Sequence, residues 1–297
     1  MEYGSRTSLT LFVMLAWGCG SDDPGGSGGG TDSDEGTATE MLTGSTGSTA
    51  PTSVNTDSAT GESSESSSEG SSSGGPSEVM LGGHTQDFIG AQPIPGASIR
   101  VFGMDSLTDV SDDMGAFTVG PLPADTPVAL VLDALTVDTI DYVGAIIPER
   151  TGLMDRNDVD ATQINQQVID TQIMYIQDQM PQMANLDEAI VVVMVNPFAG
   201  GESLDDGTVT VDMQPAPEMG TYYAPDASGN PVLNTTEIGY RTIPAAVFFN
   251  LADTQPGEIS VTAAHSVPTA WECTVDHPEW PTLGSYTTLV LVTCAPP

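Results

Sequence analysis

From Val79 onward, short runs of alternating apolar and polar residues constrain the fold more than any other feature of the sequence. Ile99 and Val101 fall on one side of one run, and Phe117 and Val119 on one side of the next. Such runs recur about every ten residues, separated by clusters of Gly, Pro and Asp, which is the pattern of a β-sandwich. The sequence therefore predicts an all-β fold from this point on.

The preceding stretch has a different composition. Residues 20–78 consist almost entirely of Gly, Ser, Thr, Asp, Glu and Pro. A segment with so few apolar side chains cannot bury enough surface to fold, so residues 19–78 are predicted to be a disordered linker. An ideal coil of nearly 60 residues spans roughly 40–45 Å. We therefore expect a flexible tether in front of the folded region.

Residues 1–18 are predicted to be an export signal. Arg6 gives a weakly basic start, and Leu9–Trp17 forms an apolar core of nine residues. Nine residues are too few to cross a bilayer as a permanent helix, whereas they suit a cleaved signal peptide. The chain is therefore expected outside the cytoplasm.

The end of this segment resembles the signal of a bacterial lipoprotein. A small residue, Gly18, stands directly before Cys19, although Trp17 occupies a place where a smaller residue is usual. The resemblance implies that Cys19 is lipid-modified and becomes the mature N-terminus. The membrane would then be a partner through the lipid, at the outer membrane or cell surface of a Gram-negative bacterium. The alternative is an ordinary secretory peptide that is cleaved nearby.

The charge balance excludes several classes of function. The chain holds 41 acidic residues against five arginines and has no lysine. Residues 79–297 carry 29 acids and four arginines, a net charge of −25. Such a surface repels phosphate backbones, which argues against nucleic-acid binding. The lack of lysine removes P-loop, Schiff-base and Ser–Lys chemistry. The acidity indicates either solubility or the binding of divalent cations.

Three short motifs give the first β unit, residues 79–152, a more specific resemblance. They are the turn Pro93–Ala97, the polar loop and aromatic Ser111–Phe117, and the pair Leu122-Pro123. Together they resemble the carboxypeptidase regulatory-like domain, over about residues 82–148. The resemblance implies a transthyretin-like β-sandwich that acts as an accessory module and not as a peptidase. The sequence departs from the pattern after Pro123, where Ala124-Asp125 replaces a usual glycine.

The segment 153–184 is predicted to contain a loop and a connecting helix. Asp160 and Gln163 have the spacing of a capping box, apolar residues recur at helical spacing from Ile164 to Met180, and Pro181 follows. These residues predict an amphipathic helix of about 20 residues. It would pack against a sandwich or the seam between domains, or offer a docking face to a partner.

Residues 185–297 are predicted to form a second β unit. Its first run, Glu188–Asn196, is strongly apolar, and further alternating runs follow it. A faint repeat places Val209 and Val211 at the positions of Ile99 and Val101, 110 residues later. We therefore expect two transthyretin- or Ig-like β-sandwich domains joined by an amphipathic helix.

The cysteines fit this layout. With Cys19 used for lipid, Cys273 and Cys294 remain, and an even pair in an exported protein predicts a disulfide. The alternative is two free buried thiols.

The acidic segment of the first unit suggests a calcium site. Asp105, Asp109, Asp112 and Asp113 offer the oxygen ligands that calcium prefers. The alternative is a strand connection in which the aspartates and Gly115 make the turn that the fold needs. No other cofactor is expected.

A glycan site is the second binding hypothesis, because transthyretin-like sandwiches often flank glycan-acting enzymes. Tyr222, Tyr223, Trp271 and Trp280 could stack on sugar rings. Trp280 and the tyrosine pair, which falls in a long Pro- and Gly-rich stretch, are expected to be the most exposed.

Nothing in the sequence indicates catalysis. The three histidines, His84, His265 and His277, have no recognised zinc spacing, and no G-x-S-x-G motif occurs. The sequence thus predicts a non-enzymatic, lipid-anchored envelope protein that presents β-sandwiches in a structural, adhesive or binding role, with a glycan or an envelope protein as possible partner. The alternative is a carbohydrate- or calcium-binding accessory module for a separate enzyme.

Overall fold

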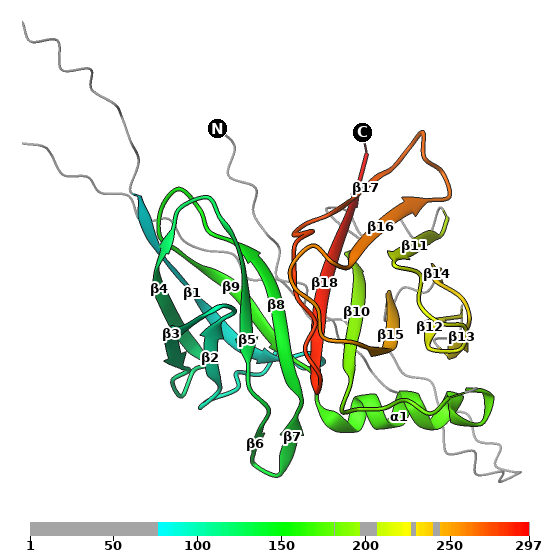
Figure 1. Cartoon of the computed structure of the whole chain (residues 1–297), viewed down its shortest axis with the longest axis horizontal. Helices are drawn as coiled ribbons and strands as arrows, with labels where there is room; N and C mark the ends of the chain where they lie inside the picture. The colour runs from blue at the N-terminus through cyan, green and yellow to red at the C-terminus, as the bar shows by residue number, and fades with distance from the viewer. Residues whose placement is uncertain (1–76, 181, 197–206, 227–229, 240–243, 297) are drawn as a thin grey trace, which may run out of the picture. The chain divides into compact units, whose positions relative to one another are not determined.

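The computed structural model describes residues 77–180, 182–196, 207–226, 230–239 and 244–296 of the 297-residue chain. The described residues are mostly β-strands and form two β-sandwiches, with a single α-helix between them in the sequence (Figure 1), so the predicted fold class is confirmed. The predicted signal peptide, Cys19 and all but the last two residues of the predicted linker lie outside the described residues.

The first sandwich consists of nine strands. Its smaller sheet has the order β4-β1-β9, with β1 in the centre, antiparallel to β4 and parallel to β9. Its second sheet contains β3, β2, β5 and β8, and β6 pairs with β7 in a separate hairpin. The bounds are β1 Glu78–Asp87, β2 Ser98–Val101, β3 Met104–Val110, β4 Ala116–Pro123, β5 Pro127–Leu132, β6 Leu135–Val137, β7 Ile140–Tyr142, β8 Gly144–Arg150 and β9 Arg156–Gln163.

The second sandwich follows the helix. Its smaller sheet has the order β14-β11-β16, and its larger one contains β13, β12, β15, β10 and β18, with β17 paired to β18. The bounds are α1 Gln166–Ile176, a 3-10 turn Gln177–Gln179, β10 Ala189–Asn196, β11 Val209–Gln214, β12 Tyr222–Pro225, β13 Pro231–Leu233, β14 Glu237–Ile238, β15 Ala245–Leu251, β16 Ser260–His265, β17 Glu272–Val275 and β18 Tyr286–Ala295.

One ten-stranded sheet runs through both sandwiches. Its order is β13-β12-β15-β10-β18-β8-β5-β2-β3, with β17 beside β18. The link is a parallel pairing of β8 with β18, in which Gly144, Ala145 and Ile146 face Tyr286, Thr287 and Thr288. Figure 1 shows β8 and β18 side by side. The two sandwiches are therefore joined by backbone pairing as well as by the helix that connects them in sequence.

The two cores lie on opposite faces of this shared sheet. Successive strand residues point to opposite faces. Val290 and Val292 of β18 belong to the core of the second sandwich, whereas Leu289 packs against the core of the first. Ala145, which pairs with Thr287, belongs to the first core as well. The sheet thus presents one face to β4-β1-β9 and the other to β14-β11-β16.

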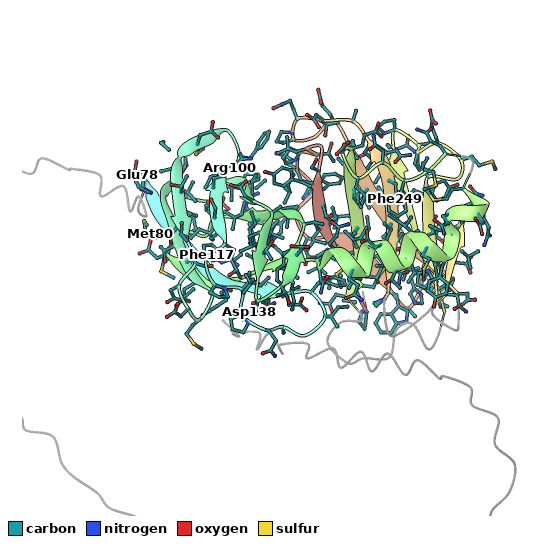
Figure 2. The ribbon with its side chains drawn as sticks, turned by 90° about the horizontal axis from the view of Figure 1, so that it is seen from below. Glu78, Met80, Arg100, Phe117, Asp138 and Phe249 are labelled. Carbon is teal, nitrogen blue, oxygen red and sulfur yellow. A yellow bond between two sulfur atoms is a disulfide. The ribbon has the colours of Figure 1, made fainter. Side chains whose placement is uncertain are left out.

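Helix α1 covers the face of the second half that no strand layer covers. Ile169 and Ile176 are buried against Ile190 and Val192 of β10 and against Phe249 of β15. Figure 2 shows the helix crossing these strands, with Phe249 labelled. Because β10 is buried on both faces, it needs the continuous apolar run that its sequence contains. The prediction that the helix packs against a sandwich is confirmed.

The predicted start of the helix is wrong. The helix begins at Gln166 and is capped by Asn165, whose Oδ1 accepts a hydrogen bond from Gln167 N at 2.8 Å. Asp160 and Gln163 belong instead to β9, which pairs with β1. The side chain of Gln163 is fully buried and donates to the backbone oxygens of Asp133 and Val143. Part of the predicted loop and helix segment 153–184 is therefore a strand of the first sandwich.

Candidate functional site

The junction between the sandwiches depends on a glycine. Gly144, the first residue of β8, faces Tyr286, the first residue of β18. A Cβ atom at position 144 would lie 2.5 Å from Cδ1 of the Tyr286 ring, closer than carbon atoms can approach. Glycine in a strand often marks such a close approach, and here it lets the Tyr286 ring lie against the backbone where the two halves join.

Polar contacts extend this junction into the first sandwich. The Tyr286 hydroxyl donates a 2.8 Å hydrogen bond to Oδ1 of Asp133, and the same oxygen lies 3.8 Å from Nε of Arg100. Burial, and next the hydrogen bond to Asp133, raises the pKa of Tyr286. Tyr286 therefore stays neutral and keeps its donor hydrogen in the physiological pH range.

A second polar contact also joins residues of the two sandwiches. Nε2 of His277, in the β17–β18 connection, is 3.7 Å from Oε2 of Glu149 in β8. Nη1 of Arg156 in β9 is 3.3 Å from the same oxygen. The side chain of Glu149 is largely buried, so it is less screened than an exposed pair. Residues from both sandwiches thus meet at one carboxylate.

The predicted calcium ligands do not gather into a metal site. Asp105 and Asp109 lie on strand β3, not in a loop, and only Asp112 and Asp113 lie in the connection to β4. Oδ1 of Asp112 accepts hydrogen bonds from the backbone N of Met114 and Ala116, both at 2.8 Å.

Of the other three predicted ligands, Asp105 and Asp109 make contacts within the fold, and Asp113 is exposed. Asp109 accepts from the backbone N of Val110 and Thr118, and Asp105 lies 3.8 Å from Arg100. Within the part of the chain that the structure describes, no group of three His, Cys, Asp or Glu residues could hold a metal ion. These contacts favour the turn interpretation of the acidic segment.

Exposure was predicted for three of the four aromatic residues, Trp280, Tyr222 and Tyr223, and it is wrong for two of them. Trp280 is fully buried in the core of the second sandwich, and Tyr223 is only 6% exposed. The Pro- and Gly-rich stretch forms short strands and not an open loop. Tyr222 and Tyr223 lie on one of them, β12, which pairs with β15.

The other two aromatic residues are half-buried. Tyr222 stacks on Phe248 with ring centroids 6.0 Å apart, and Trp271 packs on His265 at 5.6 Å. The four rings therefore do not form an open platform for a sugar. Glycan binding at Tyr222 or Trp271 stays a prediction.

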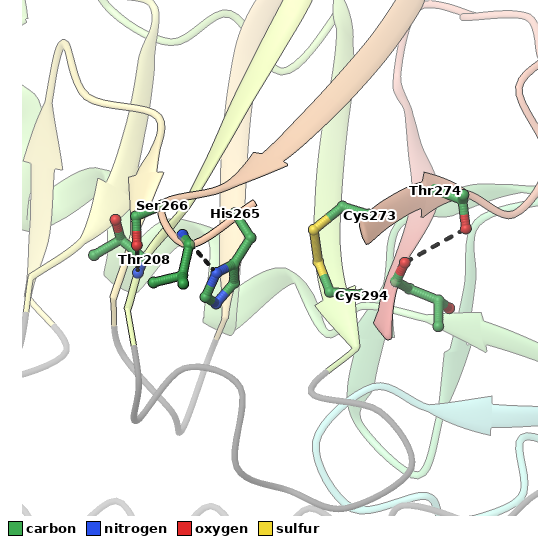
Figure 3. Close-up of a disulfide and its surroundings, with 8 residues drawn as sticks. Thr208, His265, Ser266, Cys273, Thr274 and Cys294 are labelled. Carbon is green, nitrogen blue, oxygen red and sulfur yellow. Dashed lines mark hydrogen bonds between the residues drawn. A yellow bond between two sulfur atoms is a disulfide. The ribbon is translucent and has the colours of Figure 1, made fainter. Parts of the chain in front are cut away.

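The predicted disulfide is present. The sulfur atoms of Cys273 in β17 and Cys294 in β18 are 2.02 Å apart, and the two residues face each other in the antiparallel pair (Figure 3). Cys294 is fully buried, so the bridge belongs to the core of the second sandwich. Its position fastens β17 to the strand that joins the two halves.

The histidines are dispersed, as the sequence indicates. His84 is exposed on β1, and His265 is buried with Nδ1 accepting a hydrogen bond from Val267 N at 3.0 Å (Figure 3). Ser266, next to it in sequence, accepts from Thr208 N and therefore has a structural contact of its own.

Sequence reasoning did not identify the junction residues Gly144, Tyr286 and Asp133. The available signal was the isolated glycine at the start of an apolar run, which suggests a close approach of another segment. Which segment approaches it was not encoded locally, since Tyr286 lies 142 positions further along the sequence.

Among the described residues, no helix is sufficiently long and apolar to span a membrane. No protein-family model matches the chain, and no curated protein matches it.

Solved structures show only distant similarity. The Bacillus anthracis TIE protein is 11% identical, over 73% of this chain and 34% of its own, with a TM-score of 0.23. The chain thus spans about a third of that protein. The shaft pilin SpaA from Lactobacillus rhamnosus GG is 9% identical, over 74% of this chain and 98% of its own, with a TM-score of 0.22.

The major pilin T-13 from Streptococcus pyogenes is 8% identical, over 73% of this chain and 97% of its own, with a TM-score of 0.22. Scores this low assign neither a family nor a function to the chain.

Proposed function

We propose that this chain is a lipid-anchored cell-envelope protein that presents two fused β-sandwiches in a structural or adhesive role, without catalysing a reaction. The observation that carries the proposal is the sheet that continues from one sandwich into the other through β8 and β18. Backbone hydrogen bonds across the junction resist separation of the halves, which suits a spacer or a display module better than an enzyme that must open and close.

Calorimetry on the full chain tests this fusion. Two sandwiches that share a sheet should unfold in one cooperative transition. Gly144→Val should lower the melting temperature and separate the unfolding of the two halves, because its side chain would collide with Tyr286. Gly90→Ala is the matched control, since a Cβ there would meet no atom closer than 3.5 Å. Two well-separated transitions in the unaltered chain would contradict the proposal.

The anchor is tested separately. Its support is the small residue before Cys19 and the long polar stretch after it, which would hold a folded region away from a membrane. Cells fed radiolabelled fatty acid should label the chain, and Cys19→Ala should abolish the label whereas Ser21→Ala keeps it. Labelled Cys19→Ala protein would show that the cysteine is not the anchor.

A further inference from the structure

A cavity of about 360 Å³ opens where four segments of the described chain meet. They are the β6–β7 hairpin of the first sandwich, the start of helix α1, the start of strand β10 with the residues before it, and the start of strand β18. The volume falls within the range of small-molecule sites, roughly 300–1,000 Å³. It is distinct from the residues that the sequence singled out for calcium or glycan binding.

The cavity wall is largely apolar. Isoleucine residues from α1 and β10 lie on one side, and a leucine from the hairpin and a leucine before β10 complete the aliphatic part. One tyrosine ring, from the first sandwich, contributes as well. These residues are Leu135, Tyr142, Ile169, Leu186 and Ile190.

The polar groups of the wall offer mainly hydrogen-bond acceptors. Asp141 of β7 contributes a carboxylate whose Oδ1 accepts a 2.6 Å hydrogen bond from the Thr136 hydroxyl. Gln166 at the start of α1 uses its Nε2 to donate to Oδ1 of Asp170 at 2.8 Å. One of the two amide N–H groups of Gln166 is thus occupied, and its carbonyl oxygen is left to accept a hydrogen bond from a ligand.

Thr287 adds a buried hydroxyl. It is 1% exposed, lines the cavity and pairs with Ile190 in the adjacent strand, so both side chains lie on the same face of the sheet. Its Oγ1 has no hydrogen-bond partner among the described residues. A buried polar atom without a partner costs stability, roughly 1–3 kcal/mol, and a ligand that bonds to it would recover that cost.

The charge of the lining is negative. Asp141 contributes a carboxylate to the lining, and none of the lining residues is Arg or His. The nearby Arg100 is directed to Asp133 and Asp105. An anionic ligand would be repelled, and a neutral ligand would leave the carboxylate without a counter-charge.

From this arrangement we propose that the cavity binds a small organic cation, a primary ammonium on a compact hydrocarbon body. The ammonium N–H groups donate to Asp141 and to the acceptor oxygens of Gln166 and Thr287, and the hydrocarbon packs on the aliphatic wall. The Tyr142 ring adds cation–π attraction. The proposal goes beyond the envelope role and needs only the folded region, so it stands whether or not Cys19 carries a lipid.

Titration calorimetry on the full chain with cyclohexylammonium chloride at 150 mM salt tests the proposal, since salt screens diffuse attraction to an acidic surface. Cyclohexanol and cyclohexanecarboxylate have the same body with neutral and negative heads. We expect the ammonium to bind at least tenfold more tightly than the alcohol, and the carboxylate not to bind. No heat with millimolar ammonium, or equal affinity for the alcohol, would overturn the proposal.

Variants locate the binding in the cavity. Asp141→Asn keeps the shape and the acceptor for Thr136 but removes the charge, so it should weaken ammonium binding by about tenfold, as expected for the loss of a charge-assisted hydrogen bond. Asp138→Asn, at the residue labelled in Figure 2, lies in the turn of the same hairpin and is absent from the cavity lining, so it is the matched control and should change affinity by less than about twofold.

Thr287→Val removes the unpartnered hydroxyl at nearly constant volume. We expect weaker ammonium binding together with an unchanged or higher melting temperature, because no existing hydrogen bond is lost. Equal weakening by Asp138→Asn and Asp141→Asn would show attraction to the surface at large and would overturn the assignment of the site.

Discussion

The two sandwiches use the same sheet but are stabilised differently. In the first, polar side chains hold the turns: Thr85 and Ser111 are buried, and both donate to the backbone oxygen of Ile94. The second contains a large buried ring, Trp280, and the Cys273–Cys294 bridge. Both sandwiches have a packed apolar core, so the difference lies in what is added to it: buried side-chain hydrogen bonds at the turns in the first, and a large ring and a covalent bond in the second.

Trp280 should give the largest effect. It is fully buried in the second core, so Trp280→Ala should lower the free energy of unfolding by about 3–5 kcal/mol. Denaturant unfolding measures the loss. Its Nε1 has no hydrogen-bond partner among the described residues, so Trp280→Phe should cost clearly less. A loss below about 1 kcal/mol for the alanine variant would mean that the second core does not depend on this ring.

Removal of the disulfide should come next. The bridged cysteines are 21 positions apart, and the chain-entropy relation gives a loss of about 3 kcal/mol for Cys273→Ala combined with Cys294→Ala. Denaturant unfolding with and without a reducing agent measures it. The unaltered protein should lose a similar amount on reduction, whereas the double variant should not respond. Equal stability of the oxidised protein and the variant would contradict the role of the bridge.

A turn in the first sandwich should give a smaller effect. Asp112→Ala removes two hydrogen bonds to backbone N–H groups at an exposed site, which should cost about 1 kcal/mol. Asp113→Ala is the neighbouring control and should be nearly neutral. Melting curves with and without millimolar calcium separate the two interpretations of this segment. A calcium-dependent rise in melting temperature that Asp112→Ala abolishes would restore the metal hypothesis.

Substitution of the buried tyrosines should have the smallest effect on stability at neutral pH. It should have a distinctive effect on stability at alkaline pH. Burial raises the pKa of Tyr223 above its usual range. A raised folded-state pKa gives stability that is complete below the unfolded value of about 10 and is lost as the pH rises beyond it. Tyr223→Phe should therefore change little at pH 7 and should retain more stability than the unaltered chain above pH 10.

Tyr142 gives the matching test in the first sandwich, because burial, and next the charge of Asp87, raises its pKa as well. Comparing Tyr142→Phe with Tyr223→Phe in alkaline denaturation shows which sandwich limits the stability of the whole. Identical alkaline behaviour of both variants and the unaltered chain would mean that neither hydroxyl governs the transition.

The strand pattern was readable from the sequence because alternation is a local property. Ile99 and Val101 are buried on β2, and Phe117 and Val119 on β4, as predicted. The disulfide was predictable by counting, since only two cysteines remained once Cys19 was assigned to the lipid. Period-two burial also marks Val159 within β9, so the error at the helix start came from giving a capping motif more weight than alternation.

Burial of aromatic side chains was not readable locally. Trp280 stands between Glu279 and Pro281, a polar context that suggests exposure, yet it fills the second core. Tyr223 is covered by α1, a segment about 50 positions earlier in the sequence, whose Gln172 lies 3.4 Å from its hydroxyl. Such contacts depend on tertiary structure, as does the cavity, whose wall comes from four segments that are distant in the sequence.

Strand β18 follows every other described strand in the sequence, yet it lies between β8 and β10 in the sheet. Strands β8 and β10 can complete their pairing only after β18 is present, and pairings between such distant segments form slowly. Until β18 is synthesised, β8 and β10 present open edges that can pair with other chains. The order of synthesis therefore delays the closure of both sandwiches, so that a nascent chain stays incompletely folded, and open to chaperones, until β18 emerges.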